Sequence, residues 1–330
     1  MKIRVLNESD MKQVMTMGEA IEADKEALRL YSEGKSNIPL RTNIDVTAYQ
    51  GQNLYMPGLA GDAAGIKIVS VYPNNIKQGI NSVPATMIML NEKTGEVSAL
   101  MDGTYLTRLR TGAISGAATD LLARQDAKVF ALFGTGGQAQ YQLEAILTVR
   151  KIEKVWVYDI DLDRAKDFAH RMNELFGELF EVSIEAASSP TEAVQDADII
   201  TTVTTTKTPV FDLADIKAGV HINGVGSYTP EMQELPEEIF GQAGKIYLDT
   251  RDGVLNESGD LINPLKAGII QESDITGELG ELVADKTVGR QTGDEITIFK
   301  TTGSAVLDIV VAKAIYEQAL VKNIGQDIEM

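Results

Sequence analysis

The sequence contains no cysteine and only two histidines, His170 and His221. Without cysteine there are no disulfides, thiolate nucleophiles or thiolate metal sites, and such a composition is typical of proteins in a reducing compartment. Two isolated histidines cannot form a clustered metal site, and their apolar neighbours favour structural roles for both. We therefore expect chemistry that depends on neither a thiol nor a metal.

Positive charge is also scarce, because 30 Lys and Arg residues stand against 48 Asp and Glu, for a net charge of -18. The resulting field repels phosphate backbones and anionic lipids, so neither nucleic acid nor a membrane surface is an expected partner. A small anionic substrate stays feasible, since a few arginines can set the local potential of a cleft. No apolar segment reaches the roughly 18 residues of a membrane span, and the first residues lack a signal-peptide pattern. We expect a cytoplasmic protein, and its 330 residues favour two domains.

The first third of the chain has the pattern of a mixed helix and sheet domain. Helical spacing of apolar residues predicts a helix over residues 17–34. Short β-rich runs follow at 67–73, 85–90 and 96–101, the last two flanking a hairpin turn, which indicates an antiparallel sheet. The stretch 102–123 then predicts a long helix with small residues that can bridge two domains.

From residue 127 the pattern alternates between strands and helices. Repeated β-α-β units require a parallel, doubly wound sheet, so the fold class is α/β with a Rossmann domain. A last helix, 305–320, lies beyond this pattern and is expected to return to the first domain. The expected strands are 129–133, 155–158, 181–186, 199–203, 221–225, 245–248 and 296–300, and the expected helices between them are 138–149, 161–175 and one near 191–194.

The run FGTGGQAQ connects the first strand of this pattern to its helix and has the form G-x-G-x-x-A. Gly134 allows a tight turn, Gly136 lets the backbone approach a pyrophosphate, and Ala139 permits close packing of helix and sheet. The helix N-terminus then favours phosphate groups. The sequence therefore predicts a dinucleotide site at this turn.

Asp159 ends the second strand, where such sites place the acid that binds the ribose hydroxyls. This carboxylate favours NAD(H) because it would repel a 2′-phosphate, although Arg164 nearby keeps NADP(H) as an alternative. The competing interpretation is a glycine turn without a cofactor, in which Asp159 only caps the next helix.

Three cations in the first domain are candidates for substrate binding. Arg41 follows Ile-Pro-Leu, Lys67 interrupts the apolar strand GIKIV, and Arg110 precedes the small residues TGA. The alternatives are a lysine that snorkels from a strand edge and arginines in surface ion pairs.

Seven segments in the same order resemble the ornithine cyclodeaminase and mu-crystallin family over nearly the whole chain. They are IPLR, MPGLAGDAAGIKIVS, LNEKTGEVSALMDGTYLTRLRTGAISG, FGTGGQAQ, VYDID, INGVGSYTPEMQEL and FKTTGSAVLD. The glycine turn alone is widespread, whereas the combination is specific to the family. The resemblance implies a substrate-binding and dimerisation domain of α+β type formed by residues 1–112 and 305–330, a Rossmann domain formed by 113–304, and a homodimer.

The resemblance also implies roles for individual residues. Arg41 and Arg110 would hold a substrate carboxylate, for which guanidinium forks are suited, and Lys67 would complete the anion site or activate a water. A lysine near two arginines is expected to have a lowered pKa. With the turn residues, the cofactor set is Thr86, Arg110, Thr111, Gly134, Gly136, Gly137, Gln138, Ala139, Asp159, Thr202, Val225 and Lys300.

The chain departs from the ornithine cyclodeaminases at Tyr228, where they carry an aspartate. That aspartate would bind the distal ammonium of ornithine and take its proton, whereas a phenol with a pKa near about 10 is a poor base. Tyr228 therefore favours an NAD(H)-dependent oxidoreductase that acts at the α-carbon of a small amino or imino acid, either a ketimine reductase or an alanine dehydrogenase.

Two other interpretations stay open. One is an ornithine or lysine cyclodeaminase in which Asp62 or Glu231 replaces the missing aspartate. The other is a non-catalytic protein that binds nicotinamide or another small ligand, against which the presence of Arg41, Lys67 and Arg110 argues.

Overall fold

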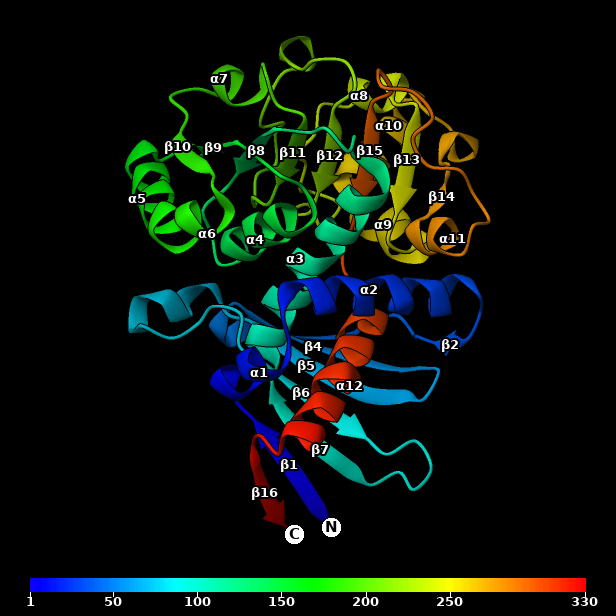
Figure 1. Cartoon of the computed structure of the whole chain (residues 1–330). Helices are drawn as coiled ribbons and strands as arrows, with labels where there is room; N and C mark the ends of the chain where they lie inside the picture. Colours follow the sequence, from blue (N-terminus) through cyan, green and yellow to red (C-terminus); the bar gives the residue numbers. More distant parts are fainter. The chain divides into compact units, whose positions relative to one another are not determined.

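The computed structural model describes residues 1–330 and divides the chain into two compact units (Figure 1). Unit 1 comprises Met1–Arg110 and Ser304–Met330, and unit 2 comprises Thr111–Gly303. The chain passes from the first to the second inside α3 (Gly103–Leu122), two residues earlier than the sequence suggested. It returns just before α12, where the dinucleotide pattern ends.

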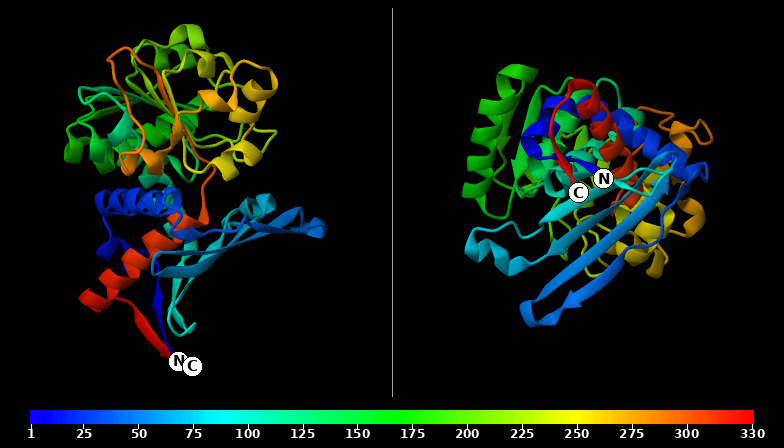
Figure 2. Two further views of the ribbon diagram at one scale, coloured as in Figure 1. Left: turned by 90° about the vertical axis from the view of Figure 1, so that its right-hand side faces the viewer. Right: turned by 90° about the horizontal axis from the view of Figure 1, so that it is seen from below.

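Unit 1 contains a mixed sheet in the order β16-β1-β7-β6-β5-β4-β2, with β3 also paired to β4. Only β1 and β7 are parallel neighbours, and the antiparallel arrangement expected for β5 to β7 is confirmed. The chain ends meet, because β1 pairs with β16 (Figure 2). The strands are β1 (Lys2–Leu6), β2 (Ser36–Asn37), β3 (Thr42–Val46), β4 (Gly51–Ala60), β5 (Ala63–Val71), β6 (Ala85–Leu90), β7 (Val97–Asp102) and β16 (Gln326–Glu329).

Three helices accompany this sheet besides the start of α3: α1 (Glu8–Val14), α2 (Met17–Ser32) and α12 (Ala305–Lys322). Thr16 is the N-cap of α2. Its hydroxyl accepts a hydrogen bond from the Glu19 backbone N–H, and the Glu19 carboxylate accepts one from the Thr16 backbone N–H. This capping box contributes about 1 kcal/mol to helix stability. Helix α12 packs against α2 and against β4, β5 and β6, as Figure 1 shows. One face of the sheet is therefore covered by helices, and α12 lies within unit 1.

Unit 2 contains a second sheet in which every pair of neighbouring strands is parallel. Its order is β10-β9-β8-β11-β12-β15-β13-β14, so the direction of winding reverses between β8 and β11. This confirms the α/β doubly wound fold expected from the alternating pattern. The strands are β8 (Val129–Phe133), β9 (Lys154–Tyr158), β10 (Ser183–Ala186), β11 (Ile199–Thr202), β12 (His221–Gly224), β13 (Lys245–Leu248), β14 (Gly277–Glu278) and β15 (Thr297–Lys300).

Helices cover both faces of the second sheet, so every residue of the central strands β11, β12 and β15 is buried. Phe130 and Leu132 enter one core with residues of α4 and α5, whereas Ala131 and Phe133 enter another with residues of α7 to α10. The helices are α4 (Ala139–Val149), α5 (Leu162–Met172), α6 (Glu178–Phe180), α7 (Pro190–Val194), α8 (Glu238–Gln242), α9 (Arg251–Glu257), α10 (Gly259–Lys266) and α11 (Leu279–Val283).

None of the helices in either unit combines the length and the apolar composition that crossing a bilayer requires.

Candidate active site

Lys67 lies in the middle of β5 on the face of the sheet that the helices cover. Alternate residues of β5 are buried, and Lys67 is 1% exposed. Its Nζ pairs with Oδ2 of Asp308 at 2.6 Å. A buried ammonium needs such a counter-charge, because an unpaired charge in the interior costs several kcal/mol. Lys67 is therefore an interior group and not a snorkelling surface lysine.

Asp308 lies in the first turn of α12 and bridges two of the predicted substrate residues. Its Oδ1 accepts a hydrogen bond of 2.8 Å from Nε of Arg110, and both side chains are buried. One carboxylate thus holds the ammonium of Lys67 and the guanidinium of Arg110 together. Sequence reasoning missed this residue, although an acid inside the apolar run AVLDIVVA was a visible signal.

Burial in this cluster lowers the pKa of Lys67 from 10.5 to about 8. Burial is the largest cause; the positive charges of Arg110 and Arg41 lower the pKa further, while Asp308 raises it. The lowering expected from the two arginines is confirmed, although burial contributes more. With a pKa of about 8, Lys67 exists in both protonation states close to neutral pH. Arg41 is half-buried in the loop between β2 and β3.

Asp24 of α2 is a second acid of this cluster that sequence reasoning missed. It is fully buried, and neither carboxylate oxygen has a hydrogen-bond partner. Burial raises its pKa well above the usual value, Arg110 opposes this increase, and Asp308 adds to it. Burial therefore disfavours the ionised form of Asp24, and its position in the buried stripe of α2 was the available signal.

Thr86 lies on β6 opposite Ile68, on the other face of the sheet from Lys67. That open face contains a cavity of about 570 Å³, which Ile68, Ser70, Thr86 and Leu100 help to line. The structure therefore does not place the Thr86 side chain beside Lys67, and its cofactor role stays a prediction.

In unit 2, the turn between β8 and α4 has the geometry that a pyrophosphate site requires. Gly134 has a φ of 98°, and a side-chain carbon there would lie 2.8 Å from the carbonyl oxygen of Val203. Around Gly136, by contrast, no atom lies within 4 Å of the position a side chain would take. Ala139 is buried at the start of α4, where a larger residue would push the helix away from the sheet. The turn is thus tight at its first glycine and open at its second.

Gly137 and Gln138 complete this turn. Gly137 is exposed, and Oε1 of Gln138 is a buried acceptor without a hydrogen-bond partner. Thr111 lies beside α4, the helix that follows this turn, since the Thr111 carbonyl oxygen accepts a hydrogen bond from Nε2 of Gln142 at 2.7 Å.

Asp159 follows β9 and reaches back to the glycine turn. Its Oδ2 accepts from the backbone and the hydroxyl of Thr135, at 3.1 and 2.6 Å. Burial alone would raise its pKa, but these hydrogen bonds, one from Asp161, and the charge of Arg164 lower it overall. An ionised carboxylate therefore lies at the strand end where a ribose diol would bind.

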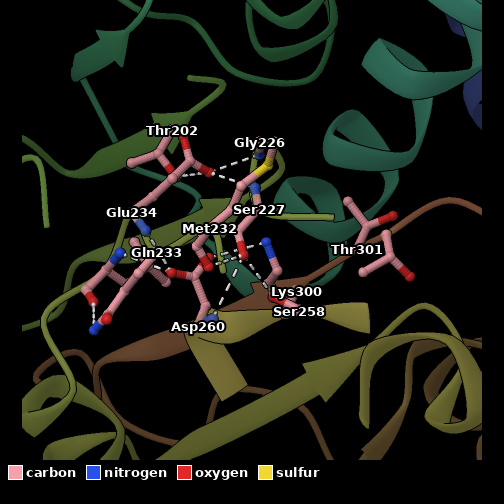
Figure 3. A network of polar contacts seen from close by, with 12 residues as sticks. Thr202, Gly226, Ser227, Met232, Gln233, Glu234, Ser258, Asp260, Lys300 and Thr301 are labelled. Atoms are coloured by element: carbon pink, nitrogen blue, oxygen red, sulfur yellow. Dashed lines mark hydrogen bonds and ion pairs between the residues drawn. The ribbon is translucent and has the colours of Figure 1, made fainter. Parts of the chain in front are cut away.

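Thr202, Val225 and Lys300 lie at the carboxyl ends of β11, β12 and β15, which are adjacent strands. The hydroxyl of Thr202 donates to Glu234 at 3.0 Å. Lys300 is fully buried and pairs with Asp260 at 3.0 Å, so its partner in this structure is a carboxylate of the protein (Figure 3). Its proposed contact with a cofactor stays a prediction.

Tyr228 and the two histidines have contrasting surroundings. Tyr228 follows β12 and is 39% exposed. His221 is buried between Thr297 and Asn223, as a structural residue should be. His170 instead lies on the surface of α5, next to Glu174.

Comparisons with known proteins agree with these observations. The family model for the ornithine cyclodeaminase/mu-crystallin family matches residues 1–323, which confirms the resemblance seen in the motifs. The Delta(1)-pyrroline-2-carboxylate reductase of Bacillus cereus (strain ZK / E33L) is 40% identical over 327 residues, which cover 98% of this chain and 99% of that protein.

Two solved structures match almost the whole chain with TM-scores of 0.92. One is the Thermococcus litoralis Delta(1)-pyrroline-2-carboxylate reductase in complex with NADH and L-proline, which is 41% identical, with 99% of this chain and 100% of that chain covered. The other is an archaeal alanine dehydrogenase dimer with bound NAD, 35% identical, with 100% of both chains covered.

Proposed function

Since this chain belongs to the ornithine cyclodeaminase/mu-crystallin family, we propose that it reduces Δ1-pyrroline-2-carboxylate, a cyclic ketimine, to proline with NADH. The observation that carries the proposal is the buried cluster of Lys67, Asp308 and Arg110, with Arg41 close enough to affect the pKa of Lys67. This cluster combines carboxylate binding with a titratable proton donor, which the reduction of an imino acid requires.

Arg110 and Arg41 are assigned to the carboxylate of the substrate. Asp308 accepts a hydrogen bond from Nε of Arg110 and so fixes the plane of the Arg110 guanidinium. The terminal nitrogens of Arg110 are then the atoms that we assign to the substrate, because a planar fork matches the two oxygens of a carboxylate.

Lys67 is assigned to proton transfer. Reduction of the C=N bond adds a hydride to the α-carbon and a proton to the nitrogen, and protonated Lys67 supplies that proton. In the reverse direction, neutral Lys67 accepts the proton of the amine. A pKa of about 8 makes both directions accessible near neutral pH, with reduction favoured below this value.

The residues of unit 2 fit a nicotinamide dinucleotide, which supplies the hydride when bound. The open space at Gly136 suits the approach of a pyrophosphate to the backbone. Asp159 is ionised and would accept hydrogen bonds from ribose hydroxyls but repel a 2′-phosphate, so we assign NADH over NADPH.

Alanine dehydrogenase activity is the second candidate, because the same residues would serve the open-chain imine formed from pyruvate and ammonia. The similarity to the archaeal alanine dehydrogenase favours it. A cyclodeaminase fits less well. Tyr228 is a weak base, Asp62 forms a surface ion pair with Lys313, and Glu231 is exposed. A binding protein without turnover would not require a buried lysine with a pKa of about 8.

We also propose a homodimer formed through the open face of the unit 1 sheet. Ile66, Ile68 and Leu100 are only half-buried on this face, and an apolar sheet face favours burial against a second copy. The similar alanine dehydrogenase structure is a dimer. The cytoplasmic location expected from the sequence stays a prediction.

The test compares three reactions of the purified protein. NADH oxidation is followed with Δ1-pyrroline-2-carboxylate and with pyruvate plus ammonia, and proline is measured after incubation with ornithine and a trace of NAD. We expect the highest kcat/KM with the cyclic imine. A higher value with pyruvate plus ammonia would make alanine dehydrogenase the function, and proline from ornithine without net NADH formation would make it a cyclodeaminase.

A further inference from the structure

Glu234 is a fully buried carboxylate that lies between β12 and α8 and has no role in the chemistry above. Five hydrogen bonds reach it, and in each of them the partner is the donor (Figure 3). The donors are the Thr202 hydroxyl (3.0 Å), the Thr204 backbone and hydroxyl (2.6 and 2.8 Å), and the backbones of Gly226 and Ser227 (2.6 and 3.1 Å). The three backbone N–H groups can only donate, so both carboxylate oxygens of Glu234 act as acceptors. Burial and the nearby Asp260 raise the pKa of Glu234, whereas Lys300 and the hydrogen bonds from Thr204 oppose this increase.

These donors come from the end of β11 and from the loops that follow the adjacent parallel strands β11 and β12. Thr204 lies in the loop after β11, and Gly226 and Ser227 lie in the loop after β12. The loops touch each other, because a side-chain carbon on Gly226 would collide with the Thr204 backbone. Glu234 therefore joins two neighbouring loops at the carboxyl edge of the sheet.

A third loop is part of the same arrangement. A side-chain carbon on Gly134 would lie 2.8 Å from the Val203 carbonyl oxygen and 3.1 Å from Cγ2 of Thr204. Thr204 is thus packed between the first glycine of the phosphate-binding turn and Gly226. This is where the winding of the sheet reverses, the position at which open α/β sheets bind their ligands.

The backbone of Glu234 is itself anchored. Oδ1 of Asp260 accepts from the backbones of Glu234 and Leu235, at 2.6 and 3.0 Å, and Oδ2 pairs with Lys300 at 3.0 Å. The connection therefore runs from the end of β15 through Asp260 and Glu234 to the loops after β12, β11 and β8. Through Asp260, Lys300 has an ion-pair partner within the protein.

We propose that Glu234 is a positioning residue for the dinucleotide, which holds the loops after β8, β11 and β12 in the conformation that binds NADH. The inference rests on the proposed function for the identity of the ligand. A glutamine has the same shape but only one acceptor oxygen, so its NH₂ group would face either the Thr204 N–H or the N–H groups of Gly226 and Ser227. One of the two loops would then lose its backbone hydrogen bonds to residue 234, and its buried N–H groups would be left unpaired.

The experiment compares Glu234→Gln with Glu238→Gln, a control that changes an exposed carboxylate four residues away. Binding of NADH is titrated by its fluorescence without a second substrate, and backbone hydrogen exchange is measured without NADH. We expect Glu234→Gln to raise the Kd and KM for NADH at least about tenfold while kcat changes less than about threefold. Exchange should accelerate in residues 202–206 and 224–228, and the control should match the wild type.

The split between KM and kcat separates positioning from simple destabilisation, which would lower the active fraction and leave the Kd for NADH unchanged. Unchanged Kd and unchanged exchange in Glu234→Gln would overturn the positioning role. A wild-type protein that does not bind NADH would instead overturn the proposed function.

If Glu234→Gln does not fold, Thr204→Val decides the question. It keeps the methyl contact with Gly134 and replaces the hydroxyl, which donates to Glu234 at 2.8 Å and accepts from the Thr206 backbone at 3.4 Å, with a methyl group. We expect a Kd for NADH about threefold higher, within the range for loss of one hydrogen bond. A wild-type Kd in this variant would overturn the proposal.

Discussion

Asp308 should set the pH at which Lys67 donates its proton. The negative charge of Asp308, 2.6 Å from Nζ, favours the ammonium form and opposes the effects of burial, Arg110 and Arg41. In Asp308→Asn this opposition is lost, so the pKa of Lys67 should fall below its value of about 8. The shape of the side chain and one acceptor oxygen are kept.

The magnitude follows from the distance. At an effective dielectric constant of about 20, two unit charges 2.6 Å apart attract each other by about 6 kcal/mol. One pKa unit corresponds to about 1.4 kcal/mol, so losing only a quarter of this attraction lowers the pKa by about one unit.

The assay is the pH dependence of kcat/KM for reduction of Δ1-pyrroline-2-carboxylate, from about pH 6 to about pH 10. Reduction needs protonated Lys67, so the wild-type rate should fall above a pKa of about 8. In Asp308→Asn this fall should begin at least about one unit lower, at a reduced maximum because Arg110 also loses the negative charge of its partner. Glu317→Gln, an exposed change on the same helix, is the control. If the descending limb of Asp308→Asn kept its position or moved to higher pH, the role of Asp308 as counter-charge would be refuted.

Three further changes test other parts of the account. Arg110→Lys should raise the KM for the imino acid by at least about tenfold in steady-state kinetics, because a single ammonium cannot form the two parallel hydrogen bonds of a guanidinium; an unchanged KM would remove Arg110 from the carboxylate site. Asp159→Ser should improve the ratio of kcat/KM for NADPH over NADH by at least about tenfold, since it removes a negative charge from the ribose site, and an unchanged ratio would contradict the assignment of Asp159. Ile68→Asp should convert a dimer into a monomer in light scattering, whereas a dimer of unchanged stability would place the interface elsewhere.

The doubly wound unit could be predicted from the sequence because its signals are local. Apolar strands of four or five residues alternate with helices, and the glycine turn follows the first strand directly. Between residues 238 and 283 only strand β13 was predicted, and the helices α8 to α11 were missed, since helices of five to eight residues are too short to show a period. Strands β1 and β16 were missed for another reason. They come from opposite ends of the chain and pair only in the folded protein.

In the candidate active site, the sequence predicted only the cations of the cluster around Asp308. Arg110 and Asp308 are 198 residues apart, and nothing in the local pattern around either residue names the other as a partner. The isolated acids in the buried stripes of α2 and α12 were a signal, because a buried charge requires a partner. Lys300 is a second residue whose partner could not be predicted from the sequence. The family resemblance implied a cofactor contact for this residue, and nothing in the local sequence indicated the ion pair with Asp260.

The most direct test of the central claim is the stoichiometry of a single reaction, in which the protein, NADH and Δ1-pyrroline-2-carboxylate are mixed and both NADH and proline are measured. We predict that one NADH disappears for each proline formed, and that Lys67→Met, which changes no residue of unit 2, forms proline at least about a hundredfold more slowly. Wild-type protein that binds NADH but forms no proline, or Lys67→Met protein that forms it at the wild-type rate, would contradict the account.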